Sequence, residues 1–222
     1  MRFRIDLKIF LFLILFYFTK QIETYTIIIL FAIIHELGHL ATGLIMGMQP
    51  EKIELTPYGV SISFKLKIKD YNKKIYKGNL LEVKKILVAI SGPLTNLLII
   101  FITIQMKIQI FSNIIIIYSN LLLILFNLLP IYPLDGGRIL KGILHIFLGK
   151  RKAEKYTNSV SFIILIMLTF IASIGIYYME NISIFIIIIF LWGLYIKQDR
   201  IDKNKNKIYD LIDKTIEISE NK

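Results

Sequence analysis

The stretch that decides the fold is Tyr25–Met48, which reads YTIIILFAIIHELGHLATGLIMGM. Its length and apolar character are those of a membrane-spanning helix. Within it, His35-Glu36-Leu37-Gly38-His39 places two histidines four residues apart on one helical face, where both imidazoles can reach one metal ion. Glu36 can then act as the general base toward a metal-bound water. Ionisable side chains are costly inside a membrane, so the pattern indicates a functional site rather than an ordinary solvated helix.

The composition indicates an integral membrane protein. The 222-residue chain is 55% hydrophobic and has a mean hydropathy of +0.65, whereas soluble domains are roughly 45–50% apolar. It contains no cysteine, so any metal must be held by histidines and carboxylates. The net charge of +11 is distributed beside apolar runs rather than on one basic face, which favours a membrane interface over a nucleic-acid partner.

The apolar runs predict an all-α polytopic membrane protein with six transmembrane helices. The expected spans lie at about 9–19, 25–47, 86–105, 113–131, 160–178 and 183–196. The first and last are shorter than the roughly 20 residues that a crossing needs, but snorkelling lysines and local bilayer thinning can accommodate them. No small-x-small cleavage site follows the first run, so we interpret it as a retained span rather than a signal peptide.

The basic residues predict the orientation of these spans. With six spans, all of the 27 Lys and Arg residues except Lys20 and Lys107 lie on one side of the membrane. The positive-inside rule therefore places both termini of a multi-pass cell-membrane protein in the cytoplasm. We divide the chain into a six-helix domain, residues 1–198, and a charged cytoplasmic tail, residues 199–222. The tail is expected to form a short amphipathic helix on the membrane surface or a fraying end.

Alternating residues follow the second expected span. Apolar and polar side chains alternate over residues 53–68, with Pro57-Tyr58-Gly59 as a turn. A period of two predicts a small amphipathic β-hairpin or re-entrant sheet. Its exposed edge could pair with an extended peptide. The alternative is a surface hairpin with no part in catalysis.

A catalytic zinc usually takes three protein ligands and leaves a position for water. Only three histidines are present, so the third ligand is His145 or a carboxylate. We prefer Asp135, which is followed by two glycines that can bend the backbone and preceded by prolines that exclude a regular helix. The alternative for Asp135 is an ordinary turn residue, and His145 is interpreted as an interfacial or packing histidine.

Two asparagines accompany further motifs. Ser91-Gly92-Pro93-Leu94-Thr95-Asn96 interrupts the third expected span; its small residues permit close helix approach and its proline kinks the helix. Asn96 is interpreted as a residue that links helices. Asn127 could do the same, but its place shortly before Asp135 makes a substrate contact credible.

Three motifs together carry a specific resemblance: His35–His39, Ser91–Asn96 and Asn127–Gly137. In these the chain resembles the site-2 protease family of intramembrane zinc metalloproteases (peptidase family M50), and within it the stage IV sporulation FB-type branch. Glu54–Gly59 is similar to the sequence that follows the zinc helix in that branch. The resemblance covers roughly residues 1–196.

The resemblance implies a site and an activity. One Zn²⁺ ion would be held by His35, His39 and Asp135, with Glu36 as the catalytic acid/base and Asn127 near the substrate. The implied activity is regulated intramembrane proteolysis by a zinc metalloendopeptidase that cuts a membrane-tethered protein, a pro-sigma factor during sporulation. Anti-sigma factors or remnant membrane peptides are alternative substrates, and membrane inhibitor proteins are further implied partners. Only about 25 residues follow the last expected span, so the branch's CBS domain is not expected, nor is a PDZ insertion.

Two other functional classes remain as alternatives. A membrane metal transporter would be expected to carry ligands across the whole bilayer, whereas the ionisable residues here gather at one site. A catalytically inactive scaffold would be expected to lack Glu36 or Asp135, and both are present. The sequence therefore favours the protease.

Overall fold

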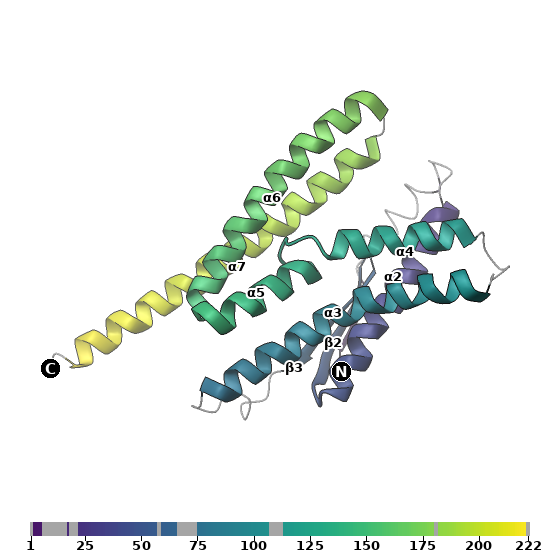
Figure 1. The fold of residues 1–222 in the computed structure, drawn as a ribbon. Coiled ribbons are helices and arrows are strands. Elements are labelled where there is room, and N and C mark those ends of the chain that lie inside the picture. The colour runs from purple at the N-terminus through teal and green to yellow at the C-terminus, as the bar shows by residue number, and fades with distance from the viewer. Residues whose placement is uncertain are drawn as a thin grey trace. The chain divides into compact units, whose positions relative to one another are not determined.

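The computed structural model describes residues 2–5, 17, 22–56, 59–65, 75–106, 113–179 and 182–220 (Figure 1). The chain divides into two compact units, Met1–Leu128 and Leu129–Lys222, which are described separately. The single domain expected over residues 1–198 stays a prediction. Of the first expected span, 9–19, only Tyr17 lies among the described residues.

Helices α2 (Ile22–Ile45), α3 (Ile75–Met106) and α4 (Asn113–Asn127) belong to the first unit (Figure 1). Helices α2 and α4 pack through a buried apolar cluster of Ile27, Phe31, Ala32, Ile116 and Leu123. Helices α2 and α3 approach closely because Gly38 lies against Thr95, whose side chain would overlap a Cβ at Gly38. Small residues permit this backbone approach between membrane helices.

The end of α2 is closed by a glycine motif. Gly47 has a φ of 73°. The Gly47 N–H donates to the Leu44 carbonyl and the Met48 N–H donates to the Gly43 carbonyl, both at a distance of 2.9 Å. This pattern is a Schellman motif, which satisfies carbonyls that have no partner within the helix. Lys84 of α3 donates to the Met46 carbonyl at 2.9 Å. These hydrogen bonds fix the direction in which the chain leaves α2 toward the β-sheet that follows.

A three-stranded sheet follows, with strands β1 (Arg2–Ile5), β2 (Gln49–Thr56) and β3 (Gly59–Lys65) in the order β1-β2-β3. Strand β3 pairs antiparallel with β2, so that Ile53 lies opposite Ile62. Strand β1 pairs parallel with β2. The sequence pattern did not predict β1, because a parallel neighbour distant in sequence carries no turn signal. Phe64 anchors β3 against α2, where its ring occupies the place of a Gly43 side chain.

Helices α5 (Asp135–Leu148), α6 (Lys150–Met179) and α7 (Ile182–Glu220) belong to the second unit. Gly149, with a φ of 78°, separates α5 from α6. Helix α7 extends through the last expected span into the tail, where a short amphipathic helix or a fraying end was expected. The division of the chain at residue 198 stays a prediction. No glycine or proline follows Gly193 in α7 to end the helix.

The fold is mostly helical, and several helices are suited to a membrane. Among the described residues, three segments are long and apolar enough to cross a bilayer: Tyr25–Ile45, Asn79–Gln105 and Lys150–Gly175. Helix α4 is apolar but shorter. These findings indicate a membrane protein, and a total of six spans stays a prediction.

Candidate metal centre

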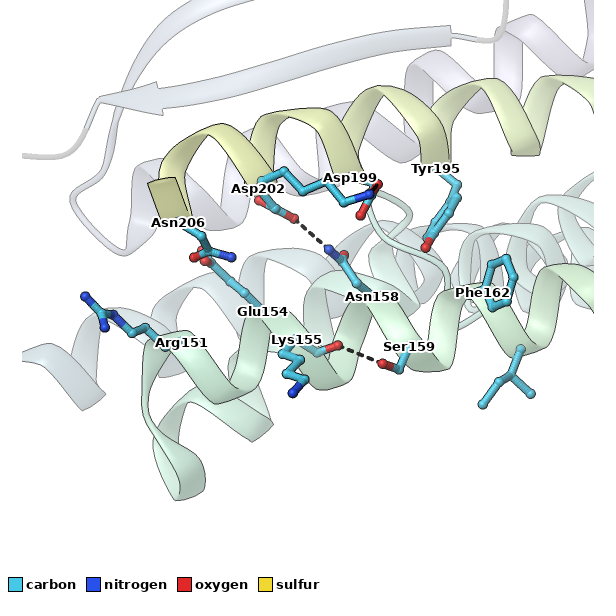
Figure 2. Close-up of a pocket in the computed structure, with 12 residues that line it drawn as sticks. Arg151, Glu154, Lys155, Asn158, Ser159, Phe162, Tyr195, Asp199, Asp202 and Asn206 are labelled. Atoms are coloured by element: carbon cyan, nitrogen blue, oxygen red, sulfur yellow. Dashed lines mark hydrogen bonds and ion pairs between the residues drawn. The ribbon is translucent and has the colours of Figure 1, made fainter. Parts of the chain in front are cut away.

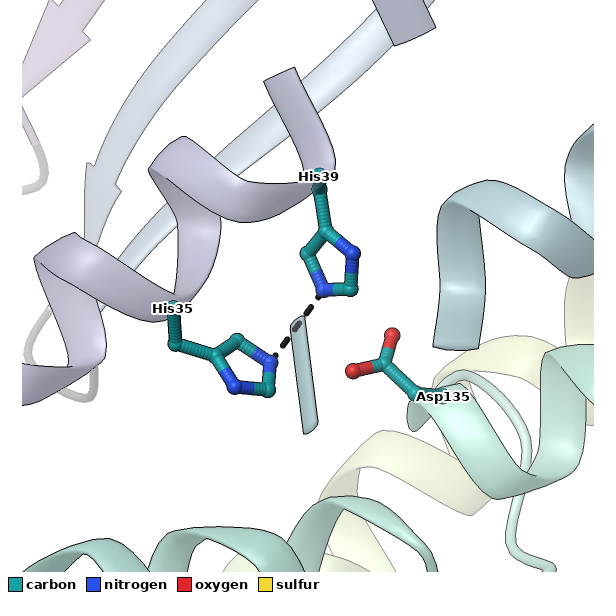
Figure 3. Close-up of side chains that lie close together, drawn as sticks. All are labelled: His35, His39 and Asp135. Carbon is teal, nitrogen blue, oxygen red and sulfur yellow. Dashed lines mark hydrogen bonds between the residues drawn. The ribbon is translucent and has the colours of Figure 1, made fainter. Parts of the chain in front are cut away.

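His35 and His39 lie one turn apart on α2 and are both 3% exposed. Their rings are perpendicular, with centroids 4.7 Å apart. The two Nε2 atoms lie 3.2 Å from each other (Figure 3). The spacing of four residues therefore brings the Nε2 atoms of both imidazoles together on one face of α2.

The main chain of α3 sets the tautomer of His39. The His39 Nδ1 atom lies 2.6 Å from the Val88 carbonyl oxygen. A carbonyl only accepts hydrogen bonds, so Nδ1 carries the proton and, in a neutral ring, Nε2 presents a lone pair. The Ser91 hydroxyl also lies 2.7 Å from the Val88 oxygen and 3.1 Å from that of Gly38. A partner of this kind on the second nitrogen is typical of metal-binding histidines.

Gly92 provides the space beside these imidazoles. A Cβ atom at Gly92 would lie only 2.5 Å from the Nε2 atoms of both His35 and His39. From the sequence we expected Gly92 to permit helix approach, and did not expect it to face the histidines. The missing side chain leaves space beside the two Nε2 atoms. No periodicity in the sequence could have identified this role.

Asp135 begins α5 and is 4% exposed. The Arg138 guanidinium lies 3.7 Å from its carboxylate. The segment before Asp135 is irregular, as its two prolines predicted, and Ile131 within it is fully buried. Gly137 packs on the backbone of Ile131 and Tyr132 so closely that no Cβ would fit. The first turn of α5 is therefore held against the segment that leads into it.

Ser161 of α6, which the sequence analysis did not single out, also holds this segment. It is fully buried; its hydroxyl accepts a hydrogen bond from the Tyr132 N–H at 3.1 Å and donates to the Thr157 carbonyl at 2.8 Å. A small polar residue inside an apolar span was the available signal. Ser161 fixes the chain shortly before Asp135.

His35, His39 and Asp135 form a group of possible metal ligands. Each offers one ligand atom, and these atoms all lie within 4.8 Å of one another (Figure 3). His145 is not in this group; it lies in the last turn of α5, where its carbonyl accepts the Gly149 N–H at 3.0 Å. Glu36 is half-buried beside His35.

The two asparagines differ in their surroundings. Asn127 ends α4, is half-buried and donates its amide to the Leu123 carbonyl at 3.0 Å. Asn96 is fully buried one turn after Gly92. Within the described part of the chain, neither amide atom of Asn96 has a hydrogen-bond partner. The expectation that Asn96 links helices therefore stays a prediction.

The comparisons with known proteins point to one kind of enzyme. Residues 102–171 match the profile described as Peptidase family M50, a segment that includes Asp135 but not the two histidines. No match is found among curated proteins. A solved structure, "Site-2 Protease from Methanocaldococcus jannaschii", is similar with a TM-score of 0.65 and 22% identity, covering 87% of this chain and 88% of that chain. The peptidase match and the shared fold together support a metalloprotease.

Proposed function

We propose that this protein is an intramembrane zinc metalloprotease that hydrolyses a peptide bond in or near the membrane segment of a tethered substrate. The observation that carries the proposal is the 3.2 Å separation of the His35 and His39 Nε2 atoms. Two nitrogens bound 2.0–2.1 Å from one tetrahedral zinc are roughly 3.3 Å apart. The histidine pair therefore already has the spacing that a shared zinc requires.

The donor set supports zinc as the metal, with Asp135 as the third protein ligand. Two imidazoles and one carboxylate are a common set for catalytic zinc, and they leave one position open. The orientation of His39 by Val88 and the gap at Gly92 both favour an ion at the Nε2 atoms. A zinc held there would supply Lewis-acid chemistry.

Glu36 is proposed as the residue that moves the proton. It follows His35 directly and is half-buried. Its carboxylate would accept a proton from the attacking water and then donate it to the nitrogen of the departing amine. Protonation of that nitrogen allows the peptide C–N bond to break.

The free edge of β3 is proposed to hold the substrate. A helical substrate hides its carbonyls in hydrogen bonds, so it must unwind before hydrolysis, and unwound backbone needs new partners inside a membrane. The order β1-β2-β3 leaves one side of β3 without a neighbouring strand among the described residues. An extended substrate could add there as a further strand. Asn127 is proposed as a side-chain contact to the same substrate.

The proposed substrate is a membrane-tethered cytoplasmic precursor, a pro-sigma factor in a sporulating cell. This rests on the resemblance to the sporulation FB-type branch and on the charge distribution, which favours cytoplasmic termini. Anti-sigma factors and remnant membrane peptides are the alternative substrates. If the proposal is right, deletion of the gene blocks release of the tethered sigma factor and stalls spore formation. Normal precursor processing in the deletion strain would refute this substrate while leaving the chemistry untouched.

The chemistry is tested by co-expression with candidate tethered precursors. Wild type should release the soluble fragment, whereas Glu36→Gln should retain zinc and lose cleavage by roughly 10²–10⁴-fold, the usual contribution of a general base. Glu82→Gln is a matched control, since Glu82 is a buried carboxylate of α3 paired with Lys85 at 2.7 Å. Cleavage that does not depend on Glu36 would contradict the proposal. Altered zinc flux instead of lost proteolysis would indicate a transporter.

A further inference from the structure

A cavity of about 850 Å³ lies between α6 and α7, within the second unit (Figure 2). Nothing in the proteolytic mechanism uses it. Positively and negatively charged side chains line one part of the cavity, and aromatic and aliphatic side chains line the other part. The lining residues are Arg151, Glu154, Lys155, Asn158, Ser159, Phe162, Ile163, Tyr195, Asp199, Asp202, Lys203 and Asn206.

Two of the lining carboxylates are buried. Glu154 is 3% exposed and Asp202 is 2% exposed. Asp202 accepts hydrogen bonds from the amides of Asn158 at 3.3 Å and Gln198 at 2.9 Å, and its carboxylate lies 3.9 Å from the Lys205 ammonium. The Glu154 Oε1 atom lies 3.4 Å from the Lys141 ammonium, whereas its Oε2 atom has no hydrogen-bond partner within the described part of the chain. A buried carboxylate oxygen is costly without a donor, and an N–H group of a bound molecule would supply one.

The cavity changes from polar to apolar along α6. Its polar end is at Arg151 and its apolar end at Ile163, a distance of roughly 18 Å at 1.5 Å per residue. At the apolar end, Phe162, Trp192 and Tyr195 form an aromatic cluster with ring centroids 5.9–6.0 Å apart. Aromatic side chains of this kind concentrate at the membrane–water interface.

The position in the membrane agrees with this polarity. The candidate span Lys150–Gly175 begins with several charged residues. If this segment spans the membrane, the polar end of the cavity lies at the level of the lipid headgroups and the apolar end faces the acyl chains. Arg151 and Lys155 are exposed at the polar end, where basic side chains attract phosphate.

We propose that this cavity binds a phospholipid whose headgroup carries a primary amine. The ammonium would donate to Glu154 and Asp202, the phosphate would lie beside Arg151 and Lys155, and an acyl chain would follow Phe162 and Ile163. An anionic headgroup without an amine would meet two buried carboxylates, and a quaternary amine has no N–H to donate. The site is independent of the proposed protease activity.

The full-length protein is tested by native mass spectrometry after equilibration with mixed micelles of defined lipids. Phosphatidylethanolamine should be retained at least roughly tenfold better than phosphatidylglycerol or phosphatidylcholine with the same chains, the ratio expected from one charge-assisted hydrogen bond. Soluble phosphoethanolamine should not compete at equal concentration, because it lacks the acyl chains. Equal retention of the three lipids, or full competition by the soluble headgroup, would overturn the proposal.

Substitutions locate the site. Glu154→Gln should reduce the preference for phosphatidylethanolamine to the level of the other lipids, while Glu82→Gln, a buried carboxylate of the first unit, should leave it unchanged. Arg151→Ala alters an exposed residue and should weaken the retention of all three lipids equally. This variant tests the site even if Glu154→Gln disturbs folding. A preference that survives Glu154→Gln in a folded protein, or an Arg151→Ala variant with unchanged retention, would contradict the assignment.

Discussion

The Nδ1–H group of His39 on α2 donates a hydrogen bond to the main-chain carbonyl of Val88 on α3, at a distance of 2.6 Å. Two helices distant in sequence are thus joined at the ring that is proposed to bind zinc. The contact holds the His39 ring so that its Nε2 atom lies 3.2 Å from that of His35 and beside Gly92 of α3. Because the partner is a backbone atom, its position depends on the path of α3 rather than on the identity of residue 88.

Replacement of Gly92 by Ala should disrupt the metal centre. The new methyl group would overlap the Nε2 atoms of both histidines, and displacement of a catalytic group by about 1 Å can cost roughly 100-fold in rate. Bound zinc, measured by elemental analysis, and cleavage rate should both fall. Gly193→Ala is the control, since nothing lies within 4 Å of a Cβ there. Equal activity of the two variants would show that Gly92 does not face the ion.

Replacement of Asp135 by Ala should reduce bound zinc and abolish cleavage, because the centre would lose one of its three proposed protein ligands. The comparison variant is His145→Ala, which alters the other residue that the sequence offered as a third ligand. We expect His145→Ala to retain zinc and activity. An active Asp135→Ala protein beside an inactive His145→Ala protein would reverse the assignment.

Replacement of Ser161 by Ala should destabilise the second unit by about 1–3 kcal/mol, since the Tyr132 N–H would lose its acceptor. The free energy of unfolding in detergent should fall, and zinc binding should weaken because the chain before Asp135 is less firmly held. Ser159→Ala, on the same helix but exposed, is the matched control. If both variants unfold alike, Ser161 does not hold this segment.

Both termini are predicted to lie in the cytoplasm. Reporter fusions after Lys20 and Glu180 should therefore read as external, and fusions after Lys77, Lys152 and Lys222 as internal. The physical basis is the retention of basic loops on the cytoplasmic side. An external signal after Lys77 would overturn the orientation and, with it, the proposed cytoplasmic substrate.

Local patterns predicted much of the secondary structure, and failed where distant segments decide it. The apolar run around His35 was sufficient for α2, since a helix satisfies its backbone within one segment. Strand β1 was missed because the strand that it pairs with, among the described residues, is β2, with Arg2 opposite Lys52, fifty residues later. The tail was expected as a short amphipathic helix or a fraying end, whereas it continues α7, since no glycine or proline follows Gly193 in that helix.

The sequence by itself determined the chemistry available to this protein. An apolar chain without cysteine, with two histidines and a glutamate on one apolar helix, allows a metal site of imidazoles and carboxylates and little else. The tertiary structure decided how those groups are presented: Val88 orients His39, Gly92 leaves the gap at both Nε2 atoms, and Ser161 holds the chain before Asp135. None of these three roles follows from local periodicity, because each depends on which backbone atoms meet when helices pack.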